Sequence, residues 1–287
     1  MKRPLNLIQL EKEFQTLRSI GDDIGYSGPI VDELHFALCA LGEVLPPHLK
    51  KMGYVLYPSR KAMGEVSDLA ERYGIRLGGH GSHLINLASV KKSLRRASKG
   101  HITALMNRME PCGGIYGVIH VGYWKGVSHE KAERFIVSAL DDISGALPLP
   151  LALEVVGSPK AIGPLDFLID ITNRYDRNIT VCVDFAHIHA TTNGSIRNKE
   201  TVRDILLKLK ERLGSRLVVV HVSDIEWSSE VGEVKHVPFG LSDLNYKAVI
   251  ETIAEETLEE CVVVCESPKR VGDTRAILET LKPVLRS

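Results

Sequence analysis

The chain has 287 residues, of which 44% are hydrophobic and 25% charged, as in ordinary globular domains. Its 36 basic and 36 acidic residues give a formal net charge of zero, which argues against a generally basic nucleic-acid binder and leaves only a local DNA-binding patch. No apolar run approaches the roughly 20 residues that span a bilayer, the start has no apolar signal-peptide core, and the cysteines lack CxxC spacing. We therefore expect a cytoplasmic protein without a membrane partner or a disulfide framework.

The beginning of the chain is less regular than the rest. Residues 1–16 predict an N-terminal helical extension, followed by a first strand in RSIGDDIG and a second in DELHFALCA. Because these two runs are close together in the sequence, the first connecting helix is expected to be rudimentary or missing. A helix over about residues 60–73 then leads to the third strand.

From about residue 75 onward, strand and helix signals alternate. The strand runs are rich in Val, Ile and Leu, as buried parallel strands are: IRLGG, IYGVIH, PLALE, ITVCVD, LVVVH and CVVVCE. Helical patterns follow them at about residues 90–109, 132–143, 165–175, 202–213, 246–253 and 276–285. With no internal repeat or linker, this order predicts an α/β fold, a TIM (β/α)₈ barrel that is imperfect at the first βα unit and forms a single domain over residues 1–287.

Each of these six strand runs ends on, or within a residue or two of, a side chain that binds metals. In parallel barrel strands these six side chains would meet at the C-terminal rim, where barrel enzymes keep their active sites. Histidine and carboxylate donors without thiolate suit zinc, with manganese or iron as alternatives. The sequence therefore predicts a closely spaced metal cluster held by His80, His120, Glu154, Asp184, His221 and Glu266.

Two further histidines lie near these strand ends. His187 follows Asp184 by three residues and is expected to face the same pocket, whereas His189 is expected to be a bystander. His236 is expected in a long loop between the LVVVH strand and its helix, where it would by itself be read as a surface residue.

A basic cluster opens the helix after His80. Two interpretations of it remain open, a solvated helix face or a phosphate contact beside the site. Its members are Lys91, Lys92, Arg95 and Arg96.

At these residues the sequence resembles endonuclease IV, the zinc-dependent apurinic/apyrimidinic (AP) endonuclease family within the xylose-isomerase-like TIM barrel group. HGSHLINLAS is similar to that family's histidine loop and is the most specific segment. The other similar segments are VIHVGYW, LALE, VCVDFAHIHA, VHVSD, KHVPFG and VVVCESP, so that the likeness covers about residues 75–268.

The resemblance implies a monomeric enzyme that cuts DNA 5′ of abasic sites with up to three zinc ions. Glu154 would be the catalytic carboxylate that bridges two ions. The first ion would be held with His80 and His120, the second with Asp184, His221 and Glu266, and the third by His187 and His236. His83 and Leu84 fall where the family inserts side chains at the flipped-out lesion.

The chain departs from the family pattern at four places. Val234 stands where the third-metal loop has an aspartate, and the adjacent Glu233 would replace it only if the loop shifts. Asp23 stands where the family's first strand has a histidine, and His83 replaces a tyrosine. The family's lesion-probing arginine has no counterpart in LGEVLPP. These departures concern the recognition of DNA more than the metal core.

Two other functions remain open. A sugar isomerase or epimerase of the same barrel group would need only Glu154, Asp184, His221 and Glu266, as a single-metal quartet whose glutamates transfer protons beside a carbonyl. A metal-binding relative without catalysis, or a structural DNA-end binder, is the third. The nuclease-like function is favoured because His80, His120 and His236 are not expected in the quartet.

Overall fold

The computed structural model describes residues 7–26, 30–35, 60–256, 258 and 260–282. These residues form two compact units. The first comprises the described residues up to Arg18 and from Ile30 to Leu153, and the second those of 19–26 and from Glu154 onward. Helix α1 (Leu7–Ile24) and strand β4 (Leu151–Glu154) contribute residues to both units.

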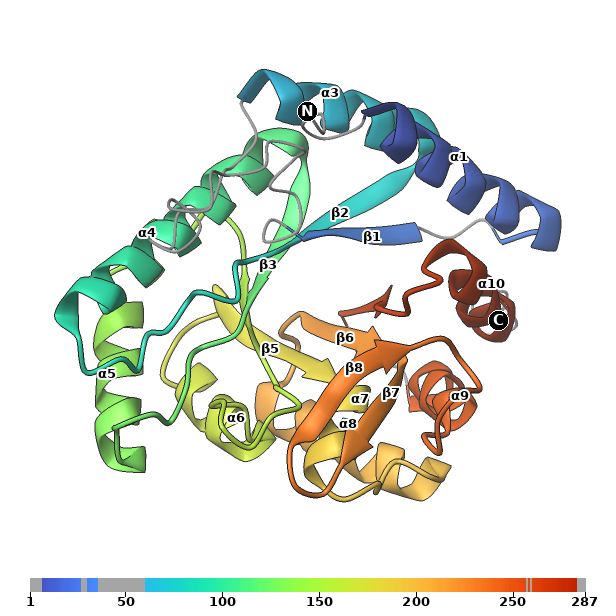
Figure 1. Cartoon of the computed structure of the whole chain (residues 1–287). Helices are drawn as coiled ribbons and strands as arrows, with labels where there is room; N and C mark the ends of the chain where they lie inside the picture. Colours follow the sequence, from blue (N-terminus) through green and yellow to red (C-terminus); the bar gives the residue numbers. More distant parts are fainter. Residues whose placement is uncertain (1–6, 27–29, 36–59, 257, 259, 283–287) are drawn as a thin grey trace. The chain divides into compact units, whose positions relative to one another are not determined.

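The first unit is built on four parallel strands. They are β1 (Ile30–His35), β2 (Ile75–His80), β3 (Gly114–Ile119) and β4, and they pair in this order. The helices of this unit are α3 (Arg60–Tyr73), α4 (Lys92–Met109) and α5 (His129–Asp141), with short 3₁₀ turns at Glu110–Cys112 and Ser144–Ala146. Helix α3 packs against β2, and α4 packs against β2 and β3 (Figure 1).

Glycines let α4 approach these strands closely. A Cβ atom on Gly79 would lie 2.6 Å from Cγ of Met109, and one on Gly117 would lie 3.0 Å from Leu105. Met109 and Leu105 are fully buried on the helix face that meets the strands. A larger residue at either glycine would therefore push the helix away from β2 and β3.

The second unit contains the remaining parallel strands, β5 (Ile179–Asp184), β6 (Val218–Val222) and β9 (Cys261–Cys265), which pair in this order. Beyond the end of β4, the Val155 N–H donates to the Cys182 carbonyl at 3.0 Å, so the chain after β4 runs beside β5. The seven parallel strands thus follow one another in chain order. The helices are α6 (Leu165–Thr172), α7 (Phe185–Thr191), α8 (Lys199–Leu213), α9 (Tyr246–Glu256) and α10 (Val271–Leu281).

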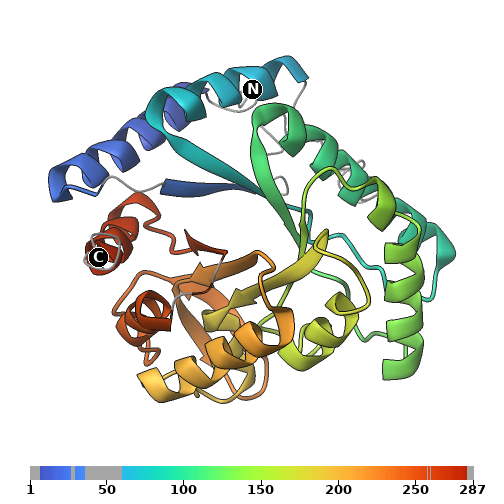
Figure 2. The ribbon, with the colours of Figure 1, turned by 180° about the vertical axis from the view of Figure 1, so that it is seen from behind.

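Helix packing in the second unit follows the parallel α/β pattern. Helix α6 packs against β5, and α9 packs between α8 and α10 (Figure 2). Strand β5 is buried along its whole length, which explains why its sequence, ITVCVD, is mostly apolar before its final Asp184 rather than alternating.

The long loop predicted around His236 is wrong. An antiparallel hairpin of β7 (Asp224–Ser228) and β8 (Gly232–Val237) follows β6, and α7 packs against it. Its register contains a bulge, because Glu226 pairs with Lys235 while Trp227 pairs with Glu233. Val234 therefore has no partner on β7.

The strand predicted in RSIGDDIG is also wrong, because these residues form the second half of α1. Buried Leu10, Phe14 and Leu17 recur at helical spacing, and the helix continues past the residues 1–16 expected for it. Asp23 lies near the end of this helix, 3.2 Å from Arg275, and does not replace a strand-end histidine.

Other predicted elements agree more closely with the structure. The helix expected over residues 60–73 is α3, and the strand expected in DELHFALCA begins earlier, as β1. The rest of that run and the segment LGEVLPP lie outside the described residues. Within the described part of the chain, no helix is both long and apolar enough to cross a membrane.

Candidate metal centre

Four of the predicted ligands come together at the strand ends of the second unit. Glu154 and Asp184 are the last residues of β4 and β5, His221 lies at the end of β6 in register with Asp184, and Glu266 directly follows β9. The four side chains each offer a ligand atom, and these atoms all lie within 4.8 Å of one another. Because parallel strands end on the same rim, the topology alone brings these residues into one group, here called the quartet.

His221 is the centre of the quartet. Its Nδ1 atom lies 3.2 Å from Oε1 of Glu154 and 3.2 Å from Oε1 of Glu266. Glu154, Asp184 and His221 are fully buried. Within the part of the chain that the structure describes, Oδ2 of Asp184 accepts no hydrogen bond. Burial raises the pKa of Asp184, and the nearby histidines offset this only in part.

This donor set fits a divalent cation. Three carboxylates gathered in a buried place are costly unless positive charge accompanies them. Oxygen and imidazole donors of this kind suit zinc, manganese or iron better than calcium.

A pair of histidines lies beside the quartet. His187 and His236 face each other with their Nε2 atoms 3.1 Å apart and their rings nearly perpendicular, at 84°. The Nδ1 atom of His187 donates to the Val155 carbonyl at 2.8 Å, and Nδ1 of His236 lies 2.7 Å from Oγ of Ser223. These contacts orient both rings and direct Nε2 of each toward the other, an arrangement typical of histidine ligands.

His187 is positioned by Asp184. The Asp184 side chain caps α7 by accepting a hydrogen bond from the His187 backbone N–H at 2.8 Å. Burial by itself would lower the pKa of His187, but the negative charges of Asp184, Glu233 and Glu154 raise it well above its usual value. The pocket around His187 therefore favours a positive charge, whether a proton or a metal ion.

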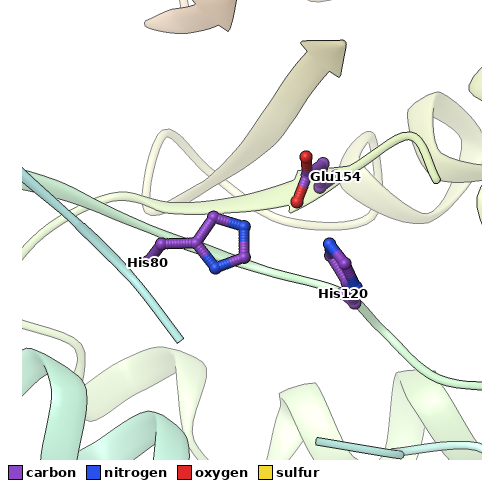
Figure 3. A group of neighbouring side chains, drawn as sticks. All are labelled: His80, His120 and Glu154. Atoms are coloured by element: carbon purple, nitrogen blue, oxygen red, sulfur yellow. The ribbon is translucent and has the colours of Figure 1, made fainter. Parts of the chain in front are cut away.

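His80 and His120 are neighbours in the first unit. Figure 3 shows the two histidine rings, which lie edge to face with their centroids 5.3 Å apart. His80 ends β2 and places Nδ1 2.9 Å from the Gly81 carbonyl. His120 follows Ile119, whose partner in the β3–β4 register is Leu153, the residue before Glu154. The register therefore ends both strands at the same level.

Most of the expected substrate contacts are exposed. His83 and Leu84 lie in the loop after β2, where the Tyr123 hydroxyl donates to the His83 carbonyl at 3.1 Å. Of the basic cluster, Lys91, Lys92 and Arg96 are exposed at the start of α4.

Arg95 differs from the rest of the basic cluster because it is half-buried. Its guanidinium lies 3.9 Å from the centroid of the Phe135 ring and donates to the Ser89 carbonyl at 2.6 Å. Arg95 thus ties α4 to its neighbours, and the solvent-facing charge comes from the other three residues.

His189 is a structural residue. It is fully buried, its Nδ1 accepts from the Ile196 N–H at 3.1 Å, and its Nε2 lies 3.0 Å from Asp243. The expectation that it is a bystander agrees with these contacts.

Cys261 is excluded as a metal ligand by its surroundings. Burial raises the pKa of Cys261 to about 12, so this thiol stays protonated and is a poor metal ligand.

The structure places two acidic residues near histidines: Glu233, which the sequence suggested only as a replacement for the missing aspartate if its loop shifts, and Glu33, which the sequence did not single out. Glu233 lies 3.1 Å from Nε2 of His187. Glu33 is a buried carboxylate on β1, the strand that pairs with the His80 strand. Glu33 follows Asp32 in the strand sequence IVDELH, and an acidic residue within a predicted strand was the available signal for it. For Glu233 the signal was its place beside Val234, but the bulge of β8 that turns it toward His187 cannot be read from spacing alone.

The chain matches the model of the xylose isomerase-like TIM barrel family over residues 43–286. An uncharacterized protein of Methanocaldococcus jannaschii is 30% identical over 69% of this chain and 74% of its own length. A probable endonuclease 4 of Halobacterium salinarum is 24% identical over 67% of this chain and 71% of its own length. The resemblance to endonuclease IV is therefore confirmed at low identity.

Solved structures with two different enzyme names have the same fold. Endonuclease IV from Thermus thermophilus superposes with a TM-score of 0.63 and 16% identity, covering 90% of this chain and 98% of that one. A D-tagatose 3-epimerase-like protein superposes with a TM-score of 0.64 and 18% identity, covering 88% and 98%. At such identities these likenesses show the fold and confirm the expected α/β barrel class. The chain belongs to the xylose isomerase-like TIM barrel family.

Proposed function

We propose that this protein is a zinc-dependent phosphodiesterase of the endonuclease IV kind that cuts DNA 5′ of abasic sites. The proposal treats the whole chain as one barrel domain that acts as a cytoplasmic monomer in base excision repair. The observation that carries it is the His187–His236 pair beside the quartet, because a single-metal isomerase needs the quartet alone. The relatives named probable endonuclease 4 support the same function.

The residues of the site would hold at least two metal ions. His80 and His120 would hold one ion with Glu154, and Asp184, His221 and Glu266 would hold another, again with Glu154. Oε1 of Glu154 lies 3.2 Å from His221 and 3.5 Å from His187, which suits a carboxylate that serves more than one ion. Zinc in such a site supplies an activated water and stabilises the charge on a phosphate.

Other residues would hold the DNA rather than the metals. Lys91, Lys92 and Arg96 would contact backbone phosphates, which needs exposed cations and no base recognition. His83 and Leu84, exposed in the loop after β2, would contact the lesion.

The second candidate function is a sugar isomerase or epimerase. The buried quartet and the fold of the D-tagatose 3-epimerase-like protein support it. In that function Glu154 and Glu266, on either side of His221, would move protons beside a carbonyl. The His187–His236 pair would then have no role in the reaction.

One paired assay separates the two functions. Zinc-loaded protein is incubated with a duplex that carries one abasic site, with the same duplex undamaged, and separately with a ketohexose. We expect a nick at the abasic site only, and no nick with Glu154→Gln. Epimerisation of the sugar with an intact abasic duplex would reject the nuclease and support the isomerase.

A further inference from the structure

The bulge in β8 changes which residues share a face of the hairpin. In a regular strand, side chains two residues apart lie on the same face, so His236 and Val234 would point the same way. The extra residue at the bulge interrupts this alternation. Val234 turns outward with 52% of its surface exposed, and Glu233 takes the face of His236 instead.

The backbone around Glu233 is held in place by two glycines. The Glu233 N–H donates to the Gly157 carbonyl at 2.8 Å, and a Cβ atom on Gly157 would lie 2.7 Å from Cβ of Glu233 and 2.7 Å from the His187 ring. Gly232 has a φ of +74°, and a Cβ atom there would lie 2.2 Å from the Gly157 carbonyl. The approach of β8 to Gly157 therefore depends on having no side chain at either position.

Three donor atoms converge as a result. Nε2 of His187 lies 3.1 Å from Nε2 of His236 and 3.1 Å from Oε2 of Glu233, while Oε1 of Glu233 lies 3.5 Å from Nε2 of His236. In a tetrahedral zinc site with bonds of about 2.0–2.1 Å, ligand atoms lie roughly 3.3–3.4 Å apart. The three separations fall around that value.

We propose that Glu233 is the carboxylate ligand of a divalent metal site that it forms with His187 and His236, and that the bulge at Val234 is what brings it there. This deepens the proposed function, on which it rests for the presence of metal. The chain thereby keeps a third metal site although Val234 stands where the family has its aspartate. The sequence motif for this site is Glu-x-x-His in a bulged strand, in place of the family's Asp-x-His.

The test is the zinc content and zinc affinity of Glu233→Gln, measured without any substrate by elemental analysis and by competition with a chromogenic chelator. Glu226→Gln is the matched control, because it makes the same chemical change on the same hairpin at an exposed residue that lies 3.0 Å from Lys235. We expect Glu233→Gln to hold one zinc fewer per chain, or to bind its weakest zinc at least 10-fold less tightly. Even the loss of a residue that contacts only the metal's ligands typically lowers metal affinity about 10–100-fold. Glu226→Gln should equal the wild type.

Unchanged zinc number and affinity in Glu233→Gln would overturn the assignment. If that variant does not fold by circular dichroism, Glu233→Asp keeps the charge on a shorter side chain and should still weaken the weakest zinc; wild-type affinity there would equally reject the site. The proposed nuclease activity is tested by a different outcome. A wild type that never nicks abasic DNA, together with the loss of one zinc in Glu233→Gln, would reject the nuclease and retain the metal site.

Discussion

Replacing Glu154 by glutamine should separate its role as a metal ligand from its role in the fold. The change keeps the shape of the side chain but removes the charge of a fully buried carboxylate that lies close to His221, Asp184 and Glu266. In the metal-free protein the loss of this charge relieves repulsion from Asp184 and Glu266 but also weakens the attraction to His187, so the variant should be about as stable as the wild type. With zinc, the variant should lose most of the stabilisation that the metal provides.

The size of this loss follows from binding linkage. Zinc at 100 times its dissociation constant stabilises the fold by about 2.7 kcal/mol, and a 100-fold loss of affinity leaves only about 0.4 kcal/mol. The difference of about 2.3 kcal/mol corresponds to a fall in Tm of roughly 5 °C for a chain of this size, at about 2 °C per kcal/mol. Nicking of abasic DNA should disappear as well, because a neutral amide bridges metal ions poorly.

The assay is thermal unfolding of both proteins with excess chelator and with zinc, beside the nicking reaction. The expected pattern is about the same Tm for Glu154→Gln and the wild type in chelator and a lower Tm for the variant in zinc. A variant that is destabilised equally in both conditions would show that Glu154 stabilises the fold without holding metal. Unchanged nicking would place the active site elsewhere.

Three further results are expected. The double variant Lys92→Ala/Arg96→Ala should bind any duplex more weakly, and its slope of log affinity against log salt should be smaller by roughly 0.9 per lost phosphate contact. The control double variant Lys210→Ala/Lys247→Ala should keep the wild-type affinity and slope. Equal slopes for the two double variants would remove α4 from the DNA interface. In metal-free protein, the raised pKa of His187 contributes stability that is fully present below the ordinary histidine pKa of about 6.5 and is lost as the pH rises through the raised pKa. The Tm should therefore fall above pH 6.5. An equally steep fall in His187→Gln would contradict this cause. Deleting Val234 should restore regular pairing of β8 and keep Glu233 on the face of His236, so zinc content should stay at the wild-type number; loss of one zinc would mean that the bulge itself is needed.

The parallel strands and their ligands could be predicted from the sequence because both depend on local patterns. Runs rich in Val, Ile and Leu such as that of β6 occur in strands buried on both sides, and a polar residue at the end of each run marks the C-terminal rim. Asp184 and His221 were expected to meet for this reason, and their strands are in register at those residues.

The errors arose where a short pattern fits two structures. RSIGDDIG contains few apolar residues and can therefore be read as a short strand. The helical spacing of Phe14 and Leu17, just before it, shows that it continues α1. The hairpin around His236 was missed because β8 is largely exposed and contains Lys235 and Glu233 instead of an apolar alternation. The position of Glu233 depends on hydrogen-bond register, which no property of the single residue reveals.

The central proposal is that the strand ends hold a cluster of metal ions rather than one. Native mass spectrometry of protein purified without any chelator, combined with elemental analysis of the same sample, counts the ions per chain. We expect two or three divalent ions per chain, with zinc as the main metal. A single ion per chain would favour the quartet of an isomerase, and no ion at all would contradict the metal centre.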